Sequence, residues 1–264
     1  MGDLDLIVRH FPIGMKYINV YALGDIHVGS EQFDERAIKK KIDIIAADSH
    51  GLVCLCGDLG DYGLKNSKTN VYKATMSPQE QQEYIFRLFK PIVNQIVAAV
   101  PGNHEERITK EVGTCPLYDL CIRWGISDVY RETMAINKYR IGTHSSKAVA
   151  FYGLTTHGST RNKHKKFISG FDGIDFAISG HTHTPEYSPH GKLRINRGAD
   201  VVTHVPYKEI VVDGNLSLGG YSTKKEYEIA PPPELQYIEL SFYRDGKGED
   251  RRTHRVINYH SIQI

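Results

Sequence analysis

Carboxylate, amide and imidazole side chains occur directly after several short apolar runs of this chain, and each run breaks at a glycine. The sites are Asp25 and His27 after Gly24, Asp58 and Asp61 after Gly57, Asn103 and His104 after Gly102, and His181 and His183 after Gly180. Oxygen and imidazole donors without thiolate suit manganese, iron or zinc. One such pair is typical of a polar loop near a helix cap, but its repetition along the chain favours a metal site.

The apolar runs predict the elements that hold these side chains. Residues 17–23, 52–56, 96–100 and 175–179 are short and bounded by glycine or proline, as expected of buried strands. Open α/β sheets place their chemistry at the carboxyl ends of the strands. We therefore expect donors from distant parts of the chain to meet at one edge of the fold.

Further helices and strands are expected around these four strands. Apolar residues at helical spacing cover 33–48, the sequence Ser77-Pro78-Gln79-Glu80 predicts the start of a helix that ends near residue 91, and residues 105–125 favour helix. Strands are expected at 6–8, 134–141, 148–154, 192–195, 199–204, 237–243 and 255–262. Polar residues 60–76 predict a long loop beside the site.

The composition is that of an ordinary globular protein. Of its 264 residues, 40% are hydrophobic and 24% charged, and the net charge of +2 indicates no particular partner. No apolar stretch long enough for a membrane span and no signal peptide is apparent, so we expect a cytoplasmic protein. The four cysteines form no metal-binding pattern and are expected to be reduced. The oligomeric state is left open.

The polar motifs resemble those of the calcineurin-like metallophosphoesterase superfamily, in the same order. They are Asp25-Ile26-His27, Gly57-Asp58-Leu59-Gly60-Asp61, Gly102-Asn103-His104-Glu105 and Gly180-His181-Thr182-His183, with the isolated His157 after a strand between the last two. The resemblance covers residues 17–200. It implies an α/β fold with a metallophosphoesterase-type β-sandwich core flanked by helices. We expect a catalytic core at 1–204 and a β-rich C-terminal extension at 205–264, packed on the same domain.

The resemblance also implies a ligand set for two divalent ions, manganese first and iron or zinc as alternatives. One ion would take Asp25, His27 and His183, the other Asn103, His157 and His181, and Asp58 would bridge them. Two ions about 3.5–4 Å apart generate a hydroxide nucleophile and stabilise the attacking and leaving oxygens of a phosphoester. His144, at a turn between two expected strands, is the alternative to His157.

Two more residues are candidates for catalysis. His104 resembles the family histidine that protonates or stabilises the leaving oxygen, and Asp61 would orient it. The alternative for His104 is a structural histidine that caps the turn. Glu105 and Glu106 are interpreted as carboxylates at a helix N-terminus rather than as bases.

The motifs favour a phosphodiester over a phosphoprotein substrate. Gly-Asn-His-Glu is similar to the Ser/Thr protein phosphatases, but Tyr62 stands where that branch has arginine. Gly-His-Thr-His resembles instead the phosphodiesterases and the Mre11-type nuclease branch. We expect a metal-dependent phosphoesterase acting on phosphodiesters of nucleic acid or nucleotides. The alternatives are a phosphomonoesterase for a metabolite or phosphoprotein, and a non-catalytic scaffold of the same fold.

Basic residues near the motifs are candidates for substrate binding. Arg161 and Lys163 lie in a basic run after His157, and Arg107 follows the Asn-His motif. Such a run would bind the backbone of DNA or RNA, with an affinity that falls with salt. The alternative for the run is the exposed face of a helix start.

Overall fold

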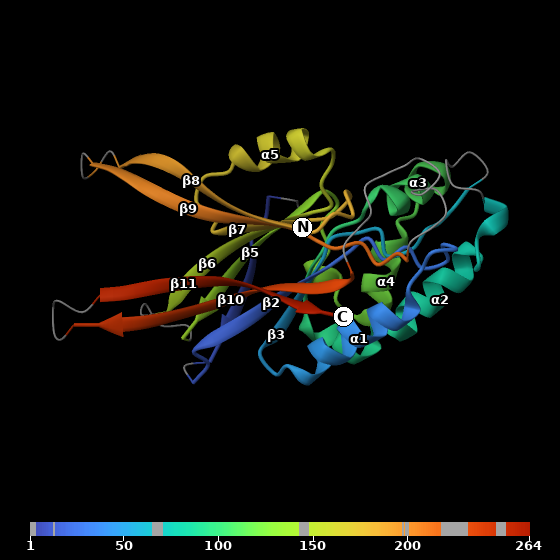
Figure 1. The fold of residues 1–264 in the computed structure, drawn as a ribbon, viewed down its shortest axis with the longest axis horizontal. Helices are drawn as coiled ribbons and strands as arrows, with labels where there is room; N and C mark the ends of the chain where they lie inside the picture. The colour runs from blue at the N-terminus through green and yellow to red at the C-terminus, as the bar shows by residue number, and fades with distance from the viewer. Residues whose placement is uncertain are drawn as a thin grey trace.

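Two β-sheets face each other in this protein, and helices cover their outer faces (Figure 1). The computed structural model describes residues 4–12, 14–64, 71–142, 148–196, 198, 201–217, 232–246 and 252–264. The strands are β1 Ile7–Phe11, β2 Tyr17–Leu23, β3 Gly51–Leu55, β4 Ile96–Ala99, β5 Met134–Ile141, β6 Val149–Thr156, β7 Phe176–Ser179, β8 Glu186–Asn196, β9 Val201–Val211, β10 Glu234–Asp245 and β11 Arg252–Gln263. The α-helices are α1 Glu35–Ala47, α2 Pro78–Leu88, α3 Asn103–Val112, α4 Pro116–Trp124 and α5 Arg161–Ser169, with short 3-10 turns at Val71–Lys73, Lys90–Gln95 and Ser127–Val129.

The sandwich expected from the sequence is confirmed. One sheet has the strand order β11-β10-β2-β3-β4, and the other has the order β1-β5-β6-β7-β9-β8. Side chains of β2 show how the core is divided, because successive residues point to opposite faces of a strand. Ile18 and Val20 lie in the core between the sheets, whereas Tyr21 and Leu23 lie in the core beneath the helices.

The helices form the two outer layers. Buried residues of α1, α2 and α4 pack on the five-stranded sheet, and α5 packs on the six-stranded sheet (Figure 1). The expected capping box at Ser77 and Glu80 is present at the start of α2. The single helix expected at 105–125 is wrong: α3 ends where Gly113 takes a φ of 77°, and Pro116 starts α4. The loop at 60–76 is described except for 65–70.

The C-terminal strands join the sheets that hold the rest of the chain. β10 pairs antiparallel with both β2 and β11, and β9 lies between β7 and β8. The strands expected at 237–243 and 255–262 are therefore confirmed as parts of longer ones. The boundary predicted between residues 204 and 205 falls inside β9, and the division into core and extension stays a prediction.

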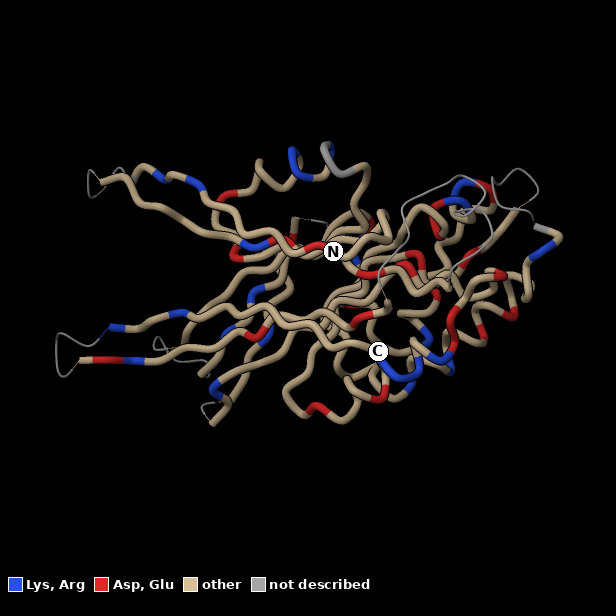
Figure 2. Tube along the Cα trace, in the orientation of Figure 1, with Lys and Arg blue, Asp and Glu red and all other residues tan. Residues whose placement is uncertain are grey.

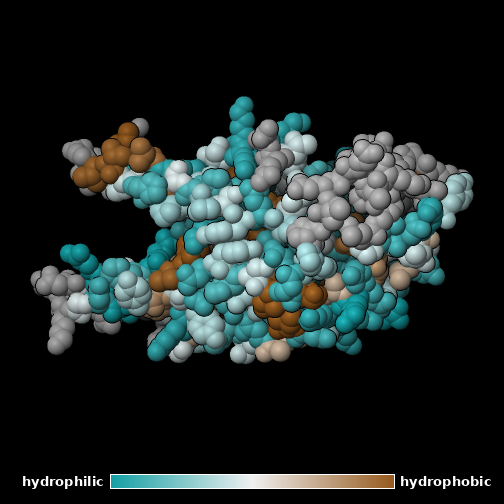
Figure 3. Space-filling model, in the orientation of Figure 1, coloured by the Kyte–Doolittle hydropathy of each residue, from teal (hydrophilic) through white to brown (hydrophobic). Residues whose placement is uncertain are grey.

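Two hairpins extend away from the helices. The hairpins β8–β9 and β10–β11 extend in the same direction beyond the body of the protein and are separated from each other there (Figure 1). Leu193, Ile195 and Val202 are exposed near the end of β8–β9, where Figure 3 shows a hydrophobic surface. Within the described ranges, no helix is long and apolar enough to span a membrane. All four cysteines are free thiols, and burial raises the pKa of Cys54 and Cys56.

A buried ion pair connects α1 with the C-terminal strands. Lys41 Nζ lies 3.2 Å from Asp213 Oδ2, and the same oxygen accepts the Glu234 N–H at 2.9 Å. Asp213 N–H in turn donates to Gln236 Oε1 at 3.0 Å. Burial lowers the pKa of Lys41 and raises the pKa of Asp213, so each charge depends on the other for compensation.

Replacing Lys41 by methionine should lower the free energy of unfolding by ~3–5 kcal/mol, because the buried carboxylate of Asp213 would lose its cation. Urea denaturation measures the change. Lys39→Met on the same helix is the control, since its exposed pair with Glu35 should contribute less than ~1 kcal/mol. Equal stability of the two variants would contradict the role given to the Lys41–Asp213 pair.

Candidate metal centre

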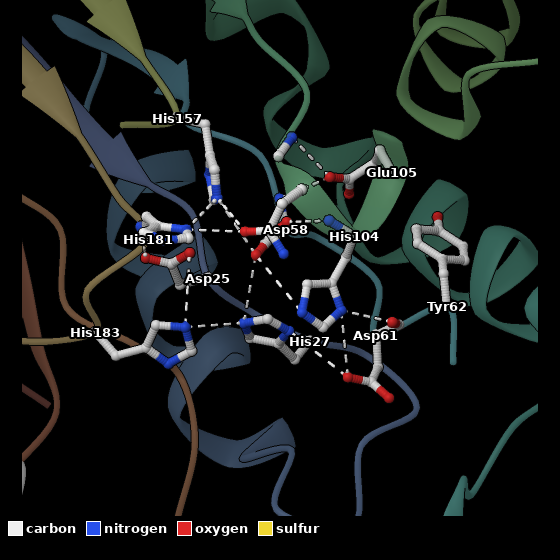
Figure 4. Close-up of polar contacts among 12 residues, drawn as sticks. Asp25, His27, Asp58, Asp61, Tyr62, His104, Glu105, His157, His181 and His183 are labelled. Carbon is white, nitrogen blue, oxygen red and sulfur yellow. Dashed lines mark hydrogen bonds and ion pairs between the residues drawn. The ribbon is translucent and has the colours of Figure 1, made fainter. Parts of the chain in front are cut away.

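The donor side chains predicted from the sequence meet at the carboxyl ends of five strands. Figure 4 shows side chains from the loops after β2, β3, β6 and β7 pointing toward one another, with His104 reaching in from α3, the helix that follows β4. The residues brought together are Asp25, His27, Asp58, Asn103, His157, His181 and His183. The strand-end arrangement expected from the apolar runs is therefore present.

One group of donors consists of Asp25, His27 and His183, whose ligand atoms all lie within 4.8 Å of one another. The two imidazoles face each other, with 3.1 Å between His27 Nε2 and His183 Nε2. Asp25 Oδ1 is 3.9 Å from His183 Nε2. These distances place two nitrogens and one oxygen around a common point, as a metal site requires.

A second group consists of Asn103, His157 and His181. Asn103 Oδ1 lies 3.0 Å from His157 Nε2 and 2.8 Å from His181 Nδ1, and the two ring nitrogens are 3.2 Å apart. His157 Nδ1 lies 2.7 Å from the carbonyl oxygen of Cys56. If Nδ1–H donates to this oxygen, Nε2 keeps the lone pair that a metal would take.

Asp58 lies between the two groups. Its Oδ2 is 3.9 Å from His27 Nε2 and 3.4 Å from His157 Nε2, and its Oδ1 accepts the His104 N–H at 2.8 Å. Burial alone would raise the pKa of Asp58, but the neighbouring histidines outweigh it and the pKa falls. The carboxylate thus stays ionised in reach of both groups, which is the position of a bridging ligand.

The charges of the site fit cations. Burial raises the pKa of Asp25 to about 7, and the charge of Asp58 adds to the rise, so a positive ion would relieve both carboxylates. Asp25 Oδ1 has no hydrogen-bond partner among the described atoms although it is buried. Burial also lowers the pKa of His27, and that of His183 to about 4, which leaves both imidazoles neutral as metal ligands must be.

His157 behaves differently from these two imidazoles. Burial alone would lower its pKa, but attraction to Asp58 outweighs burial and raises the pKa to about 10. A metal ion at His157 would therefore replace a bound proton. The whole donor set of oxygens and ring nitrogens fits two divalent ions of the manganese, iron or zinc type.

The loops that carry the donors have an unusual backbone. The residues with positive φ other than glycine include Asp25, His27, Asp58, His181 and His183, at 49°, 52°, 52°, 76° and 56°. Side chains other than glycine rarely adopt this region, and each instance costs of order 1–3 kcal/mol. Such strain concentrates at functional sites, and here it falls on candidate ligands.

Glu105 holds two of these loops together. Its carboxylate accepts the backbone N–H groups of Asp58, Leu59 and Gly102, each at 2.8 Å. A side chain on Gly102 would meet Asp58 Oδ1 at 2.1 Å, so the loops approach too closely for any residue larger than glycine. Glu105 is expected from the sequence only as a carboxylate at a helix start. Its contacts with the β3 loop are not predicted, because the sequence carries no local signal for them.

His104 and Asp61 are buried beside His27 and Asp58. His104 Nδ1 is 2.6 Å from the backbone oxygen of Asp61 and 3.4 Å from its carboxylate, and His104 Nε2 is 3.9 Å from Asp58 Oδ2. The closest partner of His104 is therefore the main chain of Asp61. The Asp61 carboxylate also lies 3.8 Å from His27 Nδ1, between the two histidines.

The structure describes the side chains of only some of the remaining candidates. Arg107 on α3 is half-buried. Burial raises the pKa of Asp61, and the charges of His104 and Arg107 offset only part of that rise. Lys163 is exposed on α5. The side chain of Arg161 and all of His144 fall outside the described residues. Tyr62 is buried and points away from the centre, with its hydroxyl 2.9 Å from Gln82 Oε1 (Figure 4).

Comparison with known proteins identifies the family. Among solved structures, a conserved uncharacterized protein (predicted phosphoesterase) from Streptococcus pneumoniae TIGR4 is similar at 11% identity over 92% of this chain and 99% of that chain, with a TM-score of 0.39. A metallophosphoesterase from Sphaerobacter thermophilus is similar at 14% identity over 93% of this chain and 89% of that chain, also with a TM-score of 0.39. The search of curated proteins gave no match. Residues 18–185 match the sequence model of the calcineurin-like phosphoesterases, and this chain belongs to that family.

Proposed function

We propose that this metal-dependent phosphoesterase hydrolyses phosphodiesters of nucleic acid or nucleotides at a centre of two ions, with manganese as the expected metal. The observation that carries the proposal is the position of Asp58, whose Oδ2 lies within 4 Å of His27 Nε2 and of His157 Nε2. Asp25, His27 and His183 would hold one ion, and Asn103, His157 and His181 the other. When bound, such ions activate water and stabilise the charge on the attacking and leaving oxygens.

His104 is proposed to donate a proton to the leaving oxygen. Its Nδ1 is occupied by the Asp61 carbonyl at 2.6 Å, which fixes the ring so that Nε2 faces the centre. A protonated His104 would give up the Nε2 proton while keeping the Nδ1–H bond. Asp61 therefore acts as a positioning residue, chiefly through its backbone oxygen.

The charge around the centre favours a diester over a monoester. A monoester at neutral pH carries up to two negative charges, and the protein phosphatases place an arginine after the second Asp of the motif. Here Tyr62 occupies that position and is buried against α2, which leaves Arg107 as the half-buried cation near Asp61. A diester carries one negative charge and needs less compensation.

Nucleic acid or a nucleotide is the proposed source of the diester. Lys163 and Lys166 are exposed on α5, whose basic residues appear as blue segments in Figure 2. Elsewhere in that view acidic and basic segments are interspersed. Binding through exposed lysines of this kind would weaken as salt rises.

In the presence of Mn²⁺, the purified protein should hydrolyse bis-p-nitrophenyl phosphate with a higher kcat/KM than p-nitrophenyl phosphate, because Tyr62 stands where an arginine would compensate the second negative charge of a monoester. Release of p-nitrophenolate measures both rates, and protein treated with chelator is the control. Hydrolysis of the monoester alone would contradict the diester proposal. Metal binding without hydrolysis of either ester would favour a scaffold role.

Asp58→Asn should abolish turnover and lower the metal content, because the amide lacks the negative charge that both ions would share. Metal analysis and the diester assay measure the two effects. Asp128→Asn is the matched control, since Asp128 is exposed and pairs with Arg9 away from the centre. A variant of Asp58 with normal metal content and normal turnover would rule out the bridging role.

His104→Ala should retain its metal and slow the hydrolysis of an alkyl diester by ~10²–10⁴-fold, as expected for loss of a general acid. The loss should be smaller for a p-nitrophenyl ester, because p-nitrophenolate leaves without a proton. Asp61→Asn keeps the backbone oxygen and should cost less than His104→Ala. If His104→Ala slowed the hydrolysis of the alkyl and the p-nitrophenyl esters by the same factor, His104 would not be the general acid.

A further inference from the structure

A polar cavity of about 100 Å³ lies next to the metal centre, between α5 and the strands β7, β8 and β9. We call it the side pocket, and its polar walls include Ser159, His164, Ser179, Thr182, Glu186 and Glu209. The two sites share one loop: His181 and His183 belong to the metal centre, and Thr182 and Thr184 line the pocket. A water molecule needs about 10–15 Å³ of such space, so the pocket has room for a small organic group.

Two polar side chains in the pocket wall have no partner within the described residues. His164 is 6% exposed and Ser179 is 1% exposed, yet neither His164 Nε2 nor Ser179 Oγ has a hydrogen-bond partner there. The carboxylate of Glu209, 3% exposed, comes within 3.7 Å of His164 Nε2, which is too far for a hydrogen bond. Buried polar atoms are nearly always hydrogen-bonded in folded proteins, so these atoms are available to bond to a molecule that enters the pocket.

The acidic residues of the pocket are held in fixed positions. Glu209 Oε2 lies 3.1 Å from His190 Nε2. Glu186 Oε1 accepts the Ser188 hydroxyl at 2.5 Å and lies 3.4 Å from Lys165 Nζ. Carboxylates and hydroxyls held in this way offer mainly acceptors, so the matching ligand is one that carries several hydrogen-bond donors.

The charge next to the pocket decides what kind of donor fits. Among the described residues, groups of three metal-donor side chains with ligand atoms within 4.8 Å occur only in the metal centre, and the side pocket contains no such group. Two divalent ions bound next to it would repel an ammonium group. Neutral hydroxyl groups avoid that repulsion and still donate to carboxylates.

We propose that the side pocket binds the alcohol part of the substrate, and that this part is a polyol or sugar whose hydroxyl groups bond to Glu209, Ser179 and His164. The inference rests on the proposed phosphodiesterase activity and specifies its substrate class. Glu209 and Ser179 are then specificity-determining residues. The shared loop that carries His181 places the polyol next to the phosphoester.

Three esters with the same leaving group test the pocket: glyceryl, ethyl and 2-aminoethyl p-nitrophenyl phosphate, each with Mn²⁺. The wild-type protein should prefer the glyceryl over the ethyl ester by roughly tenfold or more in kcat/KM, the effect of a hydrogen bond to a charged group. Ser179→Ala and Glu209→Gln should each bring that ratio toward one. Ser179→Ala removes a hydroxyl that bonds to no described group, so it should fold as the wild type does, which a melting curve checks.

Glu239→Gln is the matched control for the charge change at Glu209, because Glu239 lies on β10 in the other sheet and should leave the ratio unchanged. Equal rates on the glyceryl and ethyl esters would overturn the polyol proposal while leaving the diesterase activity in place. A preference for the aminoethyl ester would overturn it in favour of a cation pocket. No hydrolysis of any ester by the metal-loaded protein would overturn the proposed function itself, and the pocket's role with it.

Discussion

The burial of two carboxylates in one polar group is the constraint on which the rest of this structure depends. Asp25 and Asp58 are both almost completely shielded from water, and their charges oppose each other. A buried charge is stable only when it is paired or hydrogen-bonded. The imidazoles around them supply part of that compensation, and the neutral state of His27 and His183 leaves the rest to cations. Bound cations would therefore complete the charge compensation of the two carboxylates.

The scaffold stabilises an arrangement that the local backbone disfavours. Candidate ligands occupy left-handed backbone conformations, and the β3 and β4 loops approach so closely that Gly102 leaves no space for a side chain. Glu105 offsets this cost by accepting N–H groups from both loops. Burial raises the pKa of Glu105, and the three donors lower it, so the same contacts that place Asp58 also favour the charged form of Glu105. Position and charge at the centre are therefore coupled.

The sequence predicted the strand ends well because each one carries its own local signal. The short apolar run before Gly57 and the Pro101-Gly102 pair that follows β4 can be recognised without knowledge of the fold. Contacts between distant segments had no such signal. Glu209 and Ser179 line the same pocket because β7 and β9 are neighbours, with Ala177 opposite Glu209, and no motif links the two residues. The single helix expected at 105–125 failed for a different reason, because the apolar residues at helical spacing, from Leu117 to Trp124, all lie in α4, after the break at Gly113.

The two neighbouring sites impose opposite demands on a substrate. The metal centre would attract a negative phosphoester, whereas Glu186 and Glu209 would repel a second negative group that entered the side pocket. With Tyr62 turned into the core, no arginine at that position compensates an extra charge. A substrate that satisfies both sites carries one negative charge at the phosphorus and neutral hydrogen-bond donors on its alcohol. If both sites act as proposed, they would together disfavour a dianionic monoester at the centre and a further phosphate in the side pocket.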